Sequence, residues 1–241
     1  MTDYQKYFFK VQILIFVFSL FLFFIVEQLS FLFFLFLIIF YFLFYILGLN
    51  VVHRCITHNQ FHLTSFGKKL STYFMLFTMV GDPITFSNIH RYHHRYTDTA
   101  LDPHTPTKGK FYALVGWLFD NNRVKIPYSN VRDLLKDSFF KFILNHQIKI
   151  IWASILIISL ISAEIGLSLC CAMWITWIKE SIGTAIFDHS SKNRSPSNNK
   201  IWSWIGLTDY HKNHHENSSI ICDYGPTKTL IRITKFCKIS Y

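Results

Sequence analysis

The chain has 241 residues, of which just over half are hydrophobic, and 26 of them are phenylalanine. This composition excludes an ordinary soluble domain of this size and predicts a membrane protein. The formal net charge is +10 at pH 7, but the basic residues are spread along the chain rather than gathered in one stripe, which argues against nucleic-acid binding.

Two apolar segments open the chain, at 11–26 and 31–49. A helix rises about 1.5 Å per residue, so about 20 residues cross a hydrocarbon core of about 30 Å. Segment 31–49 is long enough to span. Segment 11–26 is slightly short, and Lys10 at its start can reach the interface. We do not predict a signal peptide, because no small-residue cleavage site follows and the second span begins at once.

The middle of the chain contains two shorter helical patterns. Residues 70–80 are too few to span and predict an interfacial or re-entrant helix, which the turn-forming residues Gly81, Asp82 and Pro83 would end. Residues 132–147 have helical periodicity with one apolar stripe. They predict an amphipathic helix that lies against the membrane before the third span.

A second apolar pair follows at 147–163 and 165–187. The last of these segments contains Lys179 and Glu180. Ionisable side chains are costly in lipid, so we expect these two at the membrane interface or turned to the protein interior.

Together the segments predict one domain over residues 1–241. Its fold class is an all-α integral membrane protein, with four transmembrane helices in two hairpins and a helical cap formed by 50–146 and 188–241. Lysine and arginine are absent from the connectors 27–30 and 162–165. By the positive-inside rule, both termini and the cap are therefore cytoplasmic. A composition rich in Lys, Ile, Asn and Phe suggests a bacterial inner membrane.

The basic charge on the cytoplasmic side has two interpretations. It can attract anionic lipid headgroups. It can also dock an acidic electron-carrier protein or an anionic substrate head group. Composition does not separate these alternatives.

Nine of the twelve histidines lie in three clusters and one outlying position. They are His53 and His58; His90, His93 and His94; His189; and His211, His214 and His215. The pattern H-x-x-H-H occurs twice. Neutral imidazole is the commonest protein ligand of transition metals. Nine imidazoles are too many for one ion, so the clusters predict a pair of metals.

The spacing of the clustered histidines is helical for the two triplets. Residues at i, i+3 and i+4 share a helix face, so each triplet can point at one place. His53 and His58 are five residues apart. They converge only if the helix loosens beyond the second span, or else they bind different ions. The isolated His62, His104 and His146 are expected to be structural.

The type of ligand favours iron over zinc. Zinc usually takes four ligands, often thiolates, and no cysteine lies within the triplets. Sites rich in imidazole and poor in carboxylate suit iron that activates dioxygen. Metal-bound imidazoles usually donate their second N–H to a carboxylate or carbonyl. Asp98, Asp102, Asp188 and Glu216 are candidates for that role, and a salt bridge or helix cap is the alternative for each.

The histidine motifs resemble those of the membrane acyl-CoA desaturases of the stearoyl-CoA desaturase type. The segment 53–58, H-R-C-I-T-H, resembles the first histidine box. The segment 90–95, H-R-Y-H-H-R, with Asp102-Pro103-His104 after it, resembles the second box and its D-P-H signature. The segment 211–215, H-K-N-H-H, matches the third. The resemblance covers about residues 30–225, and the three boxes are specific only together.

The resemblance implies an oxygen-dependent desaturase with a four-helix transmembrane fold, a cytoplasmic cap and two iron ions above an acyl-chain tunnel. Carried over, the iron ligands are His53, His58, His90, His93, His94, His189, His211, His214 and His215, and no further catalytic residue is implied. The acyl chain would be carried by CoA, acyl carrier protein or a lipid. Electrons would come from a separate ferredoxin- or cytochrome-type protein.

The chain departs from the family pattern at three places. The family has an asparagine four residues before the isolated histidine, where it completes one iron site through water, and here that residue is Ala185. The segment 207–210 replaces the usual G-E-G before the third box, and the tail after His215 is short. Two other functions therefore stay open: a hydroxylase or related oxygenase on the same scaffold, and a non-enzymatic metal-binding or metal-transport membrane protein.

Overall fold

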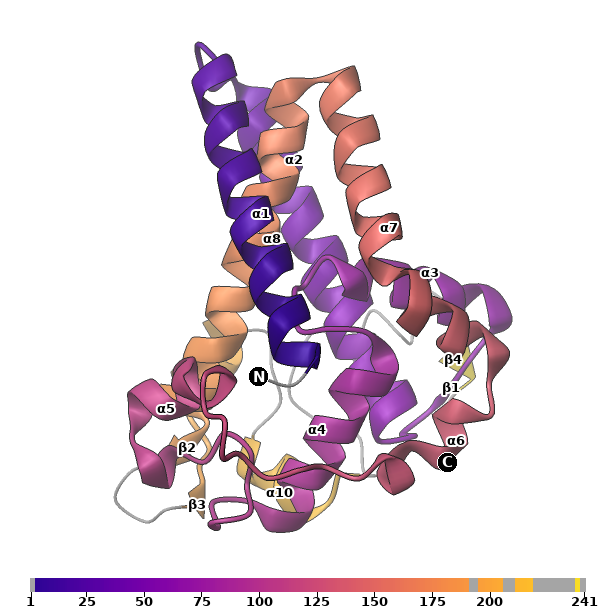
Figure 1. The fold of residues 1–241 in the computed structure, drawn as a ribbon, viewed down its shortest axis with the longest axis vertical. Coiled ribbons are helices and arrows are strands. Elements are labelled where there is room, and N and C mark those ends of the chain that lie inside the picture. The colour runs from indigo at the N-terminus through magenta and orange to yellow at the C-terminus, as the bar shows by residue number, and fades with distance from the viewer. Residues whose placement is uncertain (1–2, 191–194, 206–210, 219–236, 239–241) are drawn as a thin grey trace.

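A computed structural model describes residues 3–190, 195–205, 211–218 and 237–238 of the chain. Four long helices stand side by side at one end: α1 (Asp3–Ile25), α2 (Phe31–Phe42), α7 (Ser138–Ile161) and α8 (Ala163–Ile182). Shorter helices and loops gather at the other end (Figure 1). This arrangement is mostly helical and separates an elongated bundle from a wider cap.

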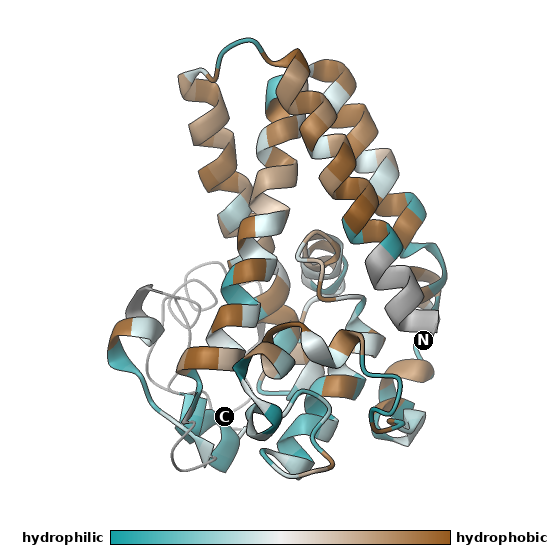
Figure 2. Ribbon diagram, turned by 60° about the vertical axis from the view of Figure 1, so that its left-hand side comes forward, coloured by the Kyte–Doolittle hydropathy of each residue, from teal (hydrophilic) through white to brown (hydrophobic). Residues whose placement is uncertain are grey.

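Among the described residues, three helical stretches are long and apolar enough to cross a membrane: Phe31–Thr57, Ser138–Ile161 and Ala163–Phe187. The apolar part of α1, Lys10–Ile25, is shorter. Figure 2 shows the hydrophobic residues concentrated in the bundle and the hydrophilic ones in the cap. A membrane protein is thereby supported, with three of the four predicted spans long enough by this measure.

Helix α8 organises the bundle, because it packs against α1, α2 and α7. Its buried Cys170 and Met173 share a core with Ile15 of α1, Phe33 of α2 and Ile155 of α7. On the outer surface large apolar side chains such as those of Phe24 and Leu160 are exposed. Such a surface is stable in lipid, where exposed apolar side chains carry no cost, and is costly in water.

Two of the long helices continue as π-helices toward the cap. After α2 come η1 (Leu43–Asn50) and η2 (Val52–Thr57), and after α8 comes η6 (Gly183–Phe187). π-helical turns are rare and are frequent at functional sites. The predicted span 31–49 is thus part of a longer helix.

The close approach of the cap to the bundle depends on Gly48. Helix α3 (Ser65–Leu76) packs against η1, and a Cβ atom on Gly48 would lie 2.7 Å from the backbone nitrogen of Met75. Any larger side chain would push α3 away from η1.

The second histidine triplet lies on α4 (Pro83–Tyr96). The Asp82 carboxylate caps this helix by accepting the backbone N–H groups of Ile84 and Thr85, and Pro83 occupies its first turn. Both features are preferred at a helix start. Gly81 and Asp82 lie in the non-helical segment before α4, but α3 already ends at Leu76 and is not ended by residues 81–83.

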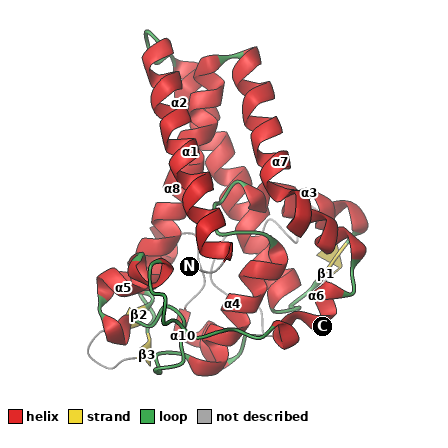
Figure 3. Cartoon of the chain, viewed as in Figure 1, coloured by secondary structure: helices red, strands yellow, loops and turns green. Residues whose placement is uncertain are grey.

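The remaining cap elements are short. They are the 3₁₀-helices η3 (Pro106–Lys108), η4 (Gly116–Leu118) and η5 (Tyr128–Val131), and the α-helices α5 (Lys110–Leu114), α6 (Arg132–Leu135), α9 (Lys200–Ile205) and α10 (His211–Glu216). There are two antiparallel strand pairs among the described residues. The strand β1 (His62–Leu63) pairs with β4 (Cys237–Lys238), which is distant in the sequence, and β2 (His189–Ser190) pairs with the nearby β3 (Ser195–Pro196). The fold is therefore mainly helical rather than strictly all-α (Figure 3).

Two predicted element boundaries are wrong. The short helix expected at 70–80 is α3, which begins at Ser65 and ends at Leu76. The single amphipathic helix expected at 132–147 is divided, because the Asp137 side chain accepts the Phe139 N–H and starts α7 there. The second half of that segment is thus continuous with the third span. Residues 207–210 and most of the tail lie outside the described residues.

Candidate metal centre

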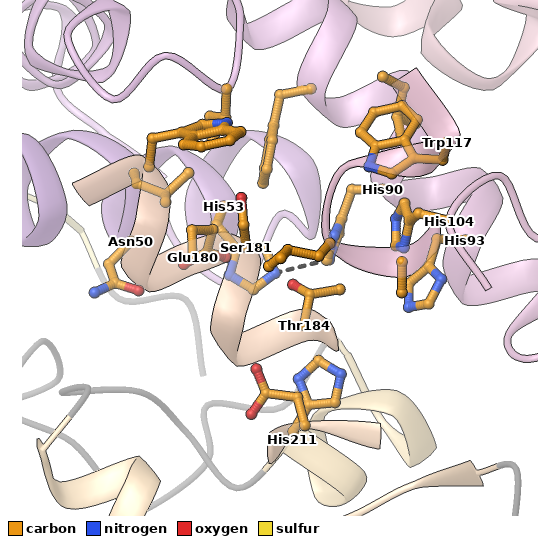
Figure 4. Close-up of a pocket in the computed structure, with 18 of the residues that line it drawn as sticks. Asn50, His53, His90, His93, His104, Trp117, Glu180, Ser181, Thr184 and His211 are labelled. Carbon is orange, nitrogen blue, oxygen red and sulfur yellow. Dashed lines mark hydrogen bonds between the residues drawn. The ribbon is translucent and has the colours of Figure 1, made fainter. Parts of the chain in front are cut away.

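The nine clustered histidines meet in two groups, although they are far apart in the sequence. The first group is His53, His58, His90, His94 and His214, and the second is His93, His189, His211 and His215. Within each group the donor nitrogens lie within 4.8 Å of one another. Figure 4 shows His53 and His90 of the first group together with His93 and His211 of the second around one pocket.

Each H-x-x-H-H triplet is divided between the groups. Helix α4 gives His90 and His94 to the first group and His93 to the second. On an α-helix, residue i+4 lies about 40° from residue i, whereas i+3 lies about 60° to the other side. The expectation that each triplet could turn to one place is therefore wrong.

Helix α10 is divided in the opposite sense. It gives His211 and His215 to the second group and His214 to the first. The rings of His94 and His215 stack between the groups with centroids 4.1 Å apart. Both helices thus lie between the two groups and bind them into one centre.

The first cluster is brought together by the π-helix η2. The backbone N–H of His58 donates to the carbonyl of His53, five residues earlier. The helix therefore loosens beyond the second span, and both histidines lie in the same group.

The distances between ring nitrogens suit metal ligation. The Nε2 atom of His53 lies 2.9 Å from that of His90 and 3.1 Å from that of His214. In the second group the Nε2 atom of His211 lies 3.0 Å from that of His189 and 2.9 Å from that of His215. Ligands about 2.1 Å from one ion lie about 3 Å apart in neighbouring positions.

One buried nitrogen in the first group points to the same chemistry. The Nε2 atom of His58 is buried and has no hydrogen-bond partner among the described residues. A buried polar atom without a partner costs free energy, and a metal ion would satisfy it. The residues present therefore fit a metal pair.

Two buried carboxylates orient imidazoles of the second group. His93 Nδ1–H donates to Asp102 Oδ2 at 2.9 Å, and His189 Nδ1–H donates to Asp98 Oδ2 at 3.0 Å. With the proton held on Nδ1, each ring turns the lone pair of Nε2 toward the group. Two of the four candidate carboxylates therefore contact clustered histidines.

The other two candidate carboxylates do not contact the rings in the same way. Glu216 is exposed and lies 3.7 Å from Lys212 on its own helix. Asp188 lines the cavity described below. For Glu216 the surface salt bridge is the correct alternative.

Burial favours the neutral form of seven of the clustered histidines by lowering their pKa values. It lowers the pKa of His58 to about 3 and that of His94 to about 4, and nearby positive charges act in the same direction. Burial also lowers the pKa values of His90, His93, His211, His214 and His215. Neutral imidazole is the form that binds metal.

Arg91, which sequence reasoning did not single out, fixes the end of η2 to α4. Its guanidinium donates to the carbonyls of Ile56, Thr57 and Asn130, and in bidentate form to Asp133. Arginine suits this role because its planar group presents several donors at fixed angles. The neighbouring His90 and His58 are thereby held in register.

A cavity of about 160 Å³ lies beside both groups (Figure 4). His104 lines it, with its ring 4.4 Å from that of His93 and its Nδ1 atom 3.9 Å from Asp102. We expected His104 to be structural, and that expectation did not foresee that it lines the cavity. Its place in the D-P-H motif beside Asp102 was the available signal. His146 instead donates to the carbonyl of Phe142, and His62 is exposed on β1.

The charged pair within the last span is turned inward. Lys179 donates to the hydroxyl of Tyr45 and lies over its ring, and its Nζ atom is 3.7 Å from Glu180 Oε2. This pair was expected at the membrane interface or in the protein interior, and the side chain of Lys179 lies in the interior. Ala185, the residue that departs from the family pattern, is buried in η6.

The comparison with known proteins points to lipid desaturases. No protein-family model matches the chain. It is 39% identical over 94 residues to an acyl-CoA C20 Delta5-desaturase of Anemone leveillei, covering 38% of this chain and 30% of that protein. It is 28% identical over 176 residues to a Delta-9 desaturase-like 4 protein of Arabidopsis thaliana, covering 68% and 58%.

A third relative is an icosanoyl-CoA 5-desaturase of Limnanthes douglasii, 33% identical over 115 residues, covering 44% of this chain and 32% of that protein. The chain thus spans from about a third to somewhat over half the length of these curated relatives. They are plant proteins and give no support to the predicted bacterial origin. The shared sequence, the three histidine motifs and the apolar helices together make the chain similar to membrane fatty acid desaturases and support its assignment to that family.

Proposed function

We propose that this protein is a fatty-acyl desaturase that uses two iron ions and dioxygen to introduce a double bond into an acyl chain. The observation that carries the proposal is the pair of imidazole groups beside one cavity. Relatives named as acyl-CoA desaturases support it. A structural zinc site is usually four-coordinate and often contains thiolates, whereas the first group offers five imidazoles and neither group contains a cysteine.

We assign one iron ion to each group. His53, His58, His90, His94 and His214 would hold the first, and His93, His189, His211 and His215 the second. When bound, the irons would supply the oxygen-dependent removal of two hydrogens from adjacent methylenes, with two electrons from a ferredoxin- or cytochrome-type protein and release of the oxygen as water.

The chain's own residues would position the reactants. Asp98 and Asp102 keep the rings of His189 and His93 turned to the metals. Apolar side chains that line the cavity, among them Leu49 and Trp117, would hold methylene groups and exclude water. The acyl chain would be carried by CoA, acyl carrier protein or a lipid.

The membrane topology is also part of the proposal. We infer that α1 is a fourth span, so that α1 with α2 and α7 with α8 form two hairpins. The distribution of Lys and Arg supports a cytoplasmic location for the metal centre and both termini. A separate electron donor would then reach the centre from the cytoplasm.

Lipid analysis tests the proposed reaction. The full chain is expressed in a host without a desaturase, and the host lipids are examined by mass spectrometry. We expect the host lipids to contain new acyl chains that are lighter by two hydrogen atoms. These products should be absent when the host expresses the His90→Ala variant instead of the wild-type protein. New chains heavier by one oxygen atom would instead identify a hydroxylase.

A second measurement distinguishes the proposed desaturase from a non-enzymatic metal-binding protein. The purified iron-loaded protein should consume oxygen when an acyl-CoA and a reductant are added. Iron binding without oxygen consumption for any acyl substrate would contradict the proposed desaturase.

A further inference from the structure

The short segment 97–102, which follows α4, supplies partners to three of the four imidazoles in the second histidine group. Two of the partners are the carboxylates of Asp98 and Asp102, which accept from the rings of His189 and His93. Their side chains are only 2% and 0% exposed. A hydrogen bond from a metal-bound imidazole to a carboxylate makes the imidazole a stronger ligand.

Thr97 is the third partner. Its hydroxyl donates to the backbone carbonyl of His93 at 2.8 Å, and its Oγ1 atom lies 3.1 Å from Nδ1 of His215. Because the hydroxyl proton is directed to the carbonyl, Oγ1 accepts from His215, and the proton of that ring lies on Nδ1. The Nε2 atom of His215 is then unprotonated and faces Nε2 of His211, 2.9 Å away, within the second group.

The segment is held in place by its own hydrogen bonds. Asp102 Oδ2 also accepts the backbone N–H of Asp98 at 2.9 Å, and Oδ1 accepts that of His104 at 3.1 Å. The Asp102 side chain thus acts only as an acceptor, as an ionised carboxylate does. Asp98 has a φ of 57°, which aspartate tolerates better than most residues. These bonds fix the partners, so the second group is preorganised for an ion.

The first histidine group has no such support among the described residues. The hydrogen bonds of its imidazoles run only to other imidazoles of the same group. The Nδ1 atom of His214 is buried without a partner in the described part of the chain.

The charges near the first group also differ from those near the second. Burial is the largest cause of the low pKa of His214, and the positive charge of Arg54 adds to it. Burial likewise lowers the pKa of His58 to about 3, and the charge of Arg91 adds to it. A positive charge that disfavours a protonated imidazole also disfavours a bound metal cation.

The number of ligands acts in the opposite direction, because the first group has five imidazoles and the second has four. The extra imidazole is neutral and brings no charge to oppose that of the ion. Loss of a single orienting partner typically costs about 10- to 100-fold in metal affinity. The second group has two carboxylates and one hydroxyl in this role, so together they outweigh one additional ring.

We propose that the two metal positions are unequal: the second group binds its iron ion more firmly than the first, and Thr97 is a positioning residue that contributes to the difference by holding His215 in one tautomer. The inference rests on the proposed function, because it takes both ions to be iron. It implies that a chain with a single ion carries that ion in the second group.

Competition for iron tests the inference. The iron-loaded full chain, kept free of oxygen, is equilibrated with increasing concentrations of an iron chelator, and the iron bound per chain is measured by mass spectrometry. We expect two steps of iron loss, whose midpoints differ by at least about tenfold in free iron concentration. His58→Ala should weaken only the ion that is lost first, and so widen the separation. A single step, or a weakening of the firmer ion by His58→Ala, overturns the inference and leaves the desaturase proposal intact.

Thr97→Val tests the hydroxyl, because valine has nearly the same shape but cannot accept from His215. It should weaken the firmer ion by about tenfold and leave the other unchanged. Thr97→Ser keeps the hydroxyl and should restore the wild-type curve. The matched control is Thr99→Val in the same segment, since the Thr99 hydroxyl donates to the Tyr96 carbonyl and contacts no clustered histidine. Equal weakening of both ions by Thr97→Val would show that Thr97 supports only the fold.

The curves of the wild type and of His58→Ala decide the order of the two ions even where Thr97→Val does not fold. If the wild-type chain binds no iron, the proposed function fails and the inference fails with it.

Discussion

His58 lies one π-helical turn after His53, with its backbone N–H 3.1 Å from the His53 carbonyl and the two ring centroids 4.9 Å apart. In an α-helix residues five apart are rotated by about 140° about the axis, so their rings would face different directions. The wider turn of η2 removes that rotation. A local change in helix type thus decides whether the first histidine motif can serve one metal.

His58→Ala should weaken iron binding at one site and leave the other occupied. The first group has five imidazoles, and the variant loses one of them. Iron content after dialysis against a chelator, measured by mass spectrometry, should fall below two per chain. His62→Ala is the control, because His62 belongs to neither group. A His58→Ala protein that retains both ions as firmly as the wild type would contradict the assignment.

Asp102→Asn and Asp98→Asn should each weaken the second site. Either change removes the carboxylate that holds a ligand ring in its tautomer. Loss of such partners typically costs about 10- to 100-fold in metal affinity or activity. A metal titration should show one weakened step and one unchanged step. Glu216→Gln, at an exposed site next to His215, should bind both ions normally, and an effect equal to that of Asp102→Asn would refute the distinction.

Arg91→Lys should destabilise the protein although the charge is kept. Lysine cannot reproduce the bonds to the Ile56 and Thr57 carbonyls together with the bidentate contact to Asp133. We expect a loss of about 1–3 kcal/mol and reduced iron content, measured by thermal unfolding in detergent and by metal analysis. Arg95→Lys loses only a 3.3 Å contact to Asn130 and should change little. Equal effects of the two variants would show that Arg91 has no special bracing role.

The Asp137 carboxylate at the start of α7 should make the stability of the fold partly dependent on pH in acid. Burial would raise the pKa of Asp137, but hydrogen bonds from Lys68 and from the Phe139 N–H outweigh it and hold the pKa below the ordinary aspartate value. A lowered pKa in the folded state means that the stabilisation is present above about pH 4 and is lost as the pH falls through the folded-state value. Asp137→Asn should therefore flatten the fall of melting temperature in acid.

Asp137→Ala separates the charge from the helix cap. Asparagine can still accept the Phe139 N–H, whereas alanine cannot, so the alanine variant should lose about 0.5–2 kcal/mol more at neutral pH. Thermal unfolding of both variants across pH provides the comparison. Identical curves for the two variants would show that the cap contributes nothing.

Local pattern was sufficient to predict much of this protein. The apolar runs at 31–49 and 165–187 predicted the helices that now extend as Phe31–Thr57 and Ala163–Phe187, because hydrophobic length alone decides what lipid can accommodate. The turn-forming residues 81–83 predicted a break before the second histidine triplet, and α4 begins at Pro83 with Asp82 as its cap. The nine histidines predicted metal because of their number and spacing.

The grouping of the histidines was decided only by the tertiary structure. The sequence spacing gives the angles between His90, His93 and His94 around one helix. It does not show that α4 lies between the two histidine groups, with ligand residues from other elements on each side. The opposite division of α10 and the meeting of His53 and His58 with His214 likewise depend on how distant segments pack. Periodicity describes one element at a time, whereas a metal centre is defined by the directions in which several elements present their side chains to one point.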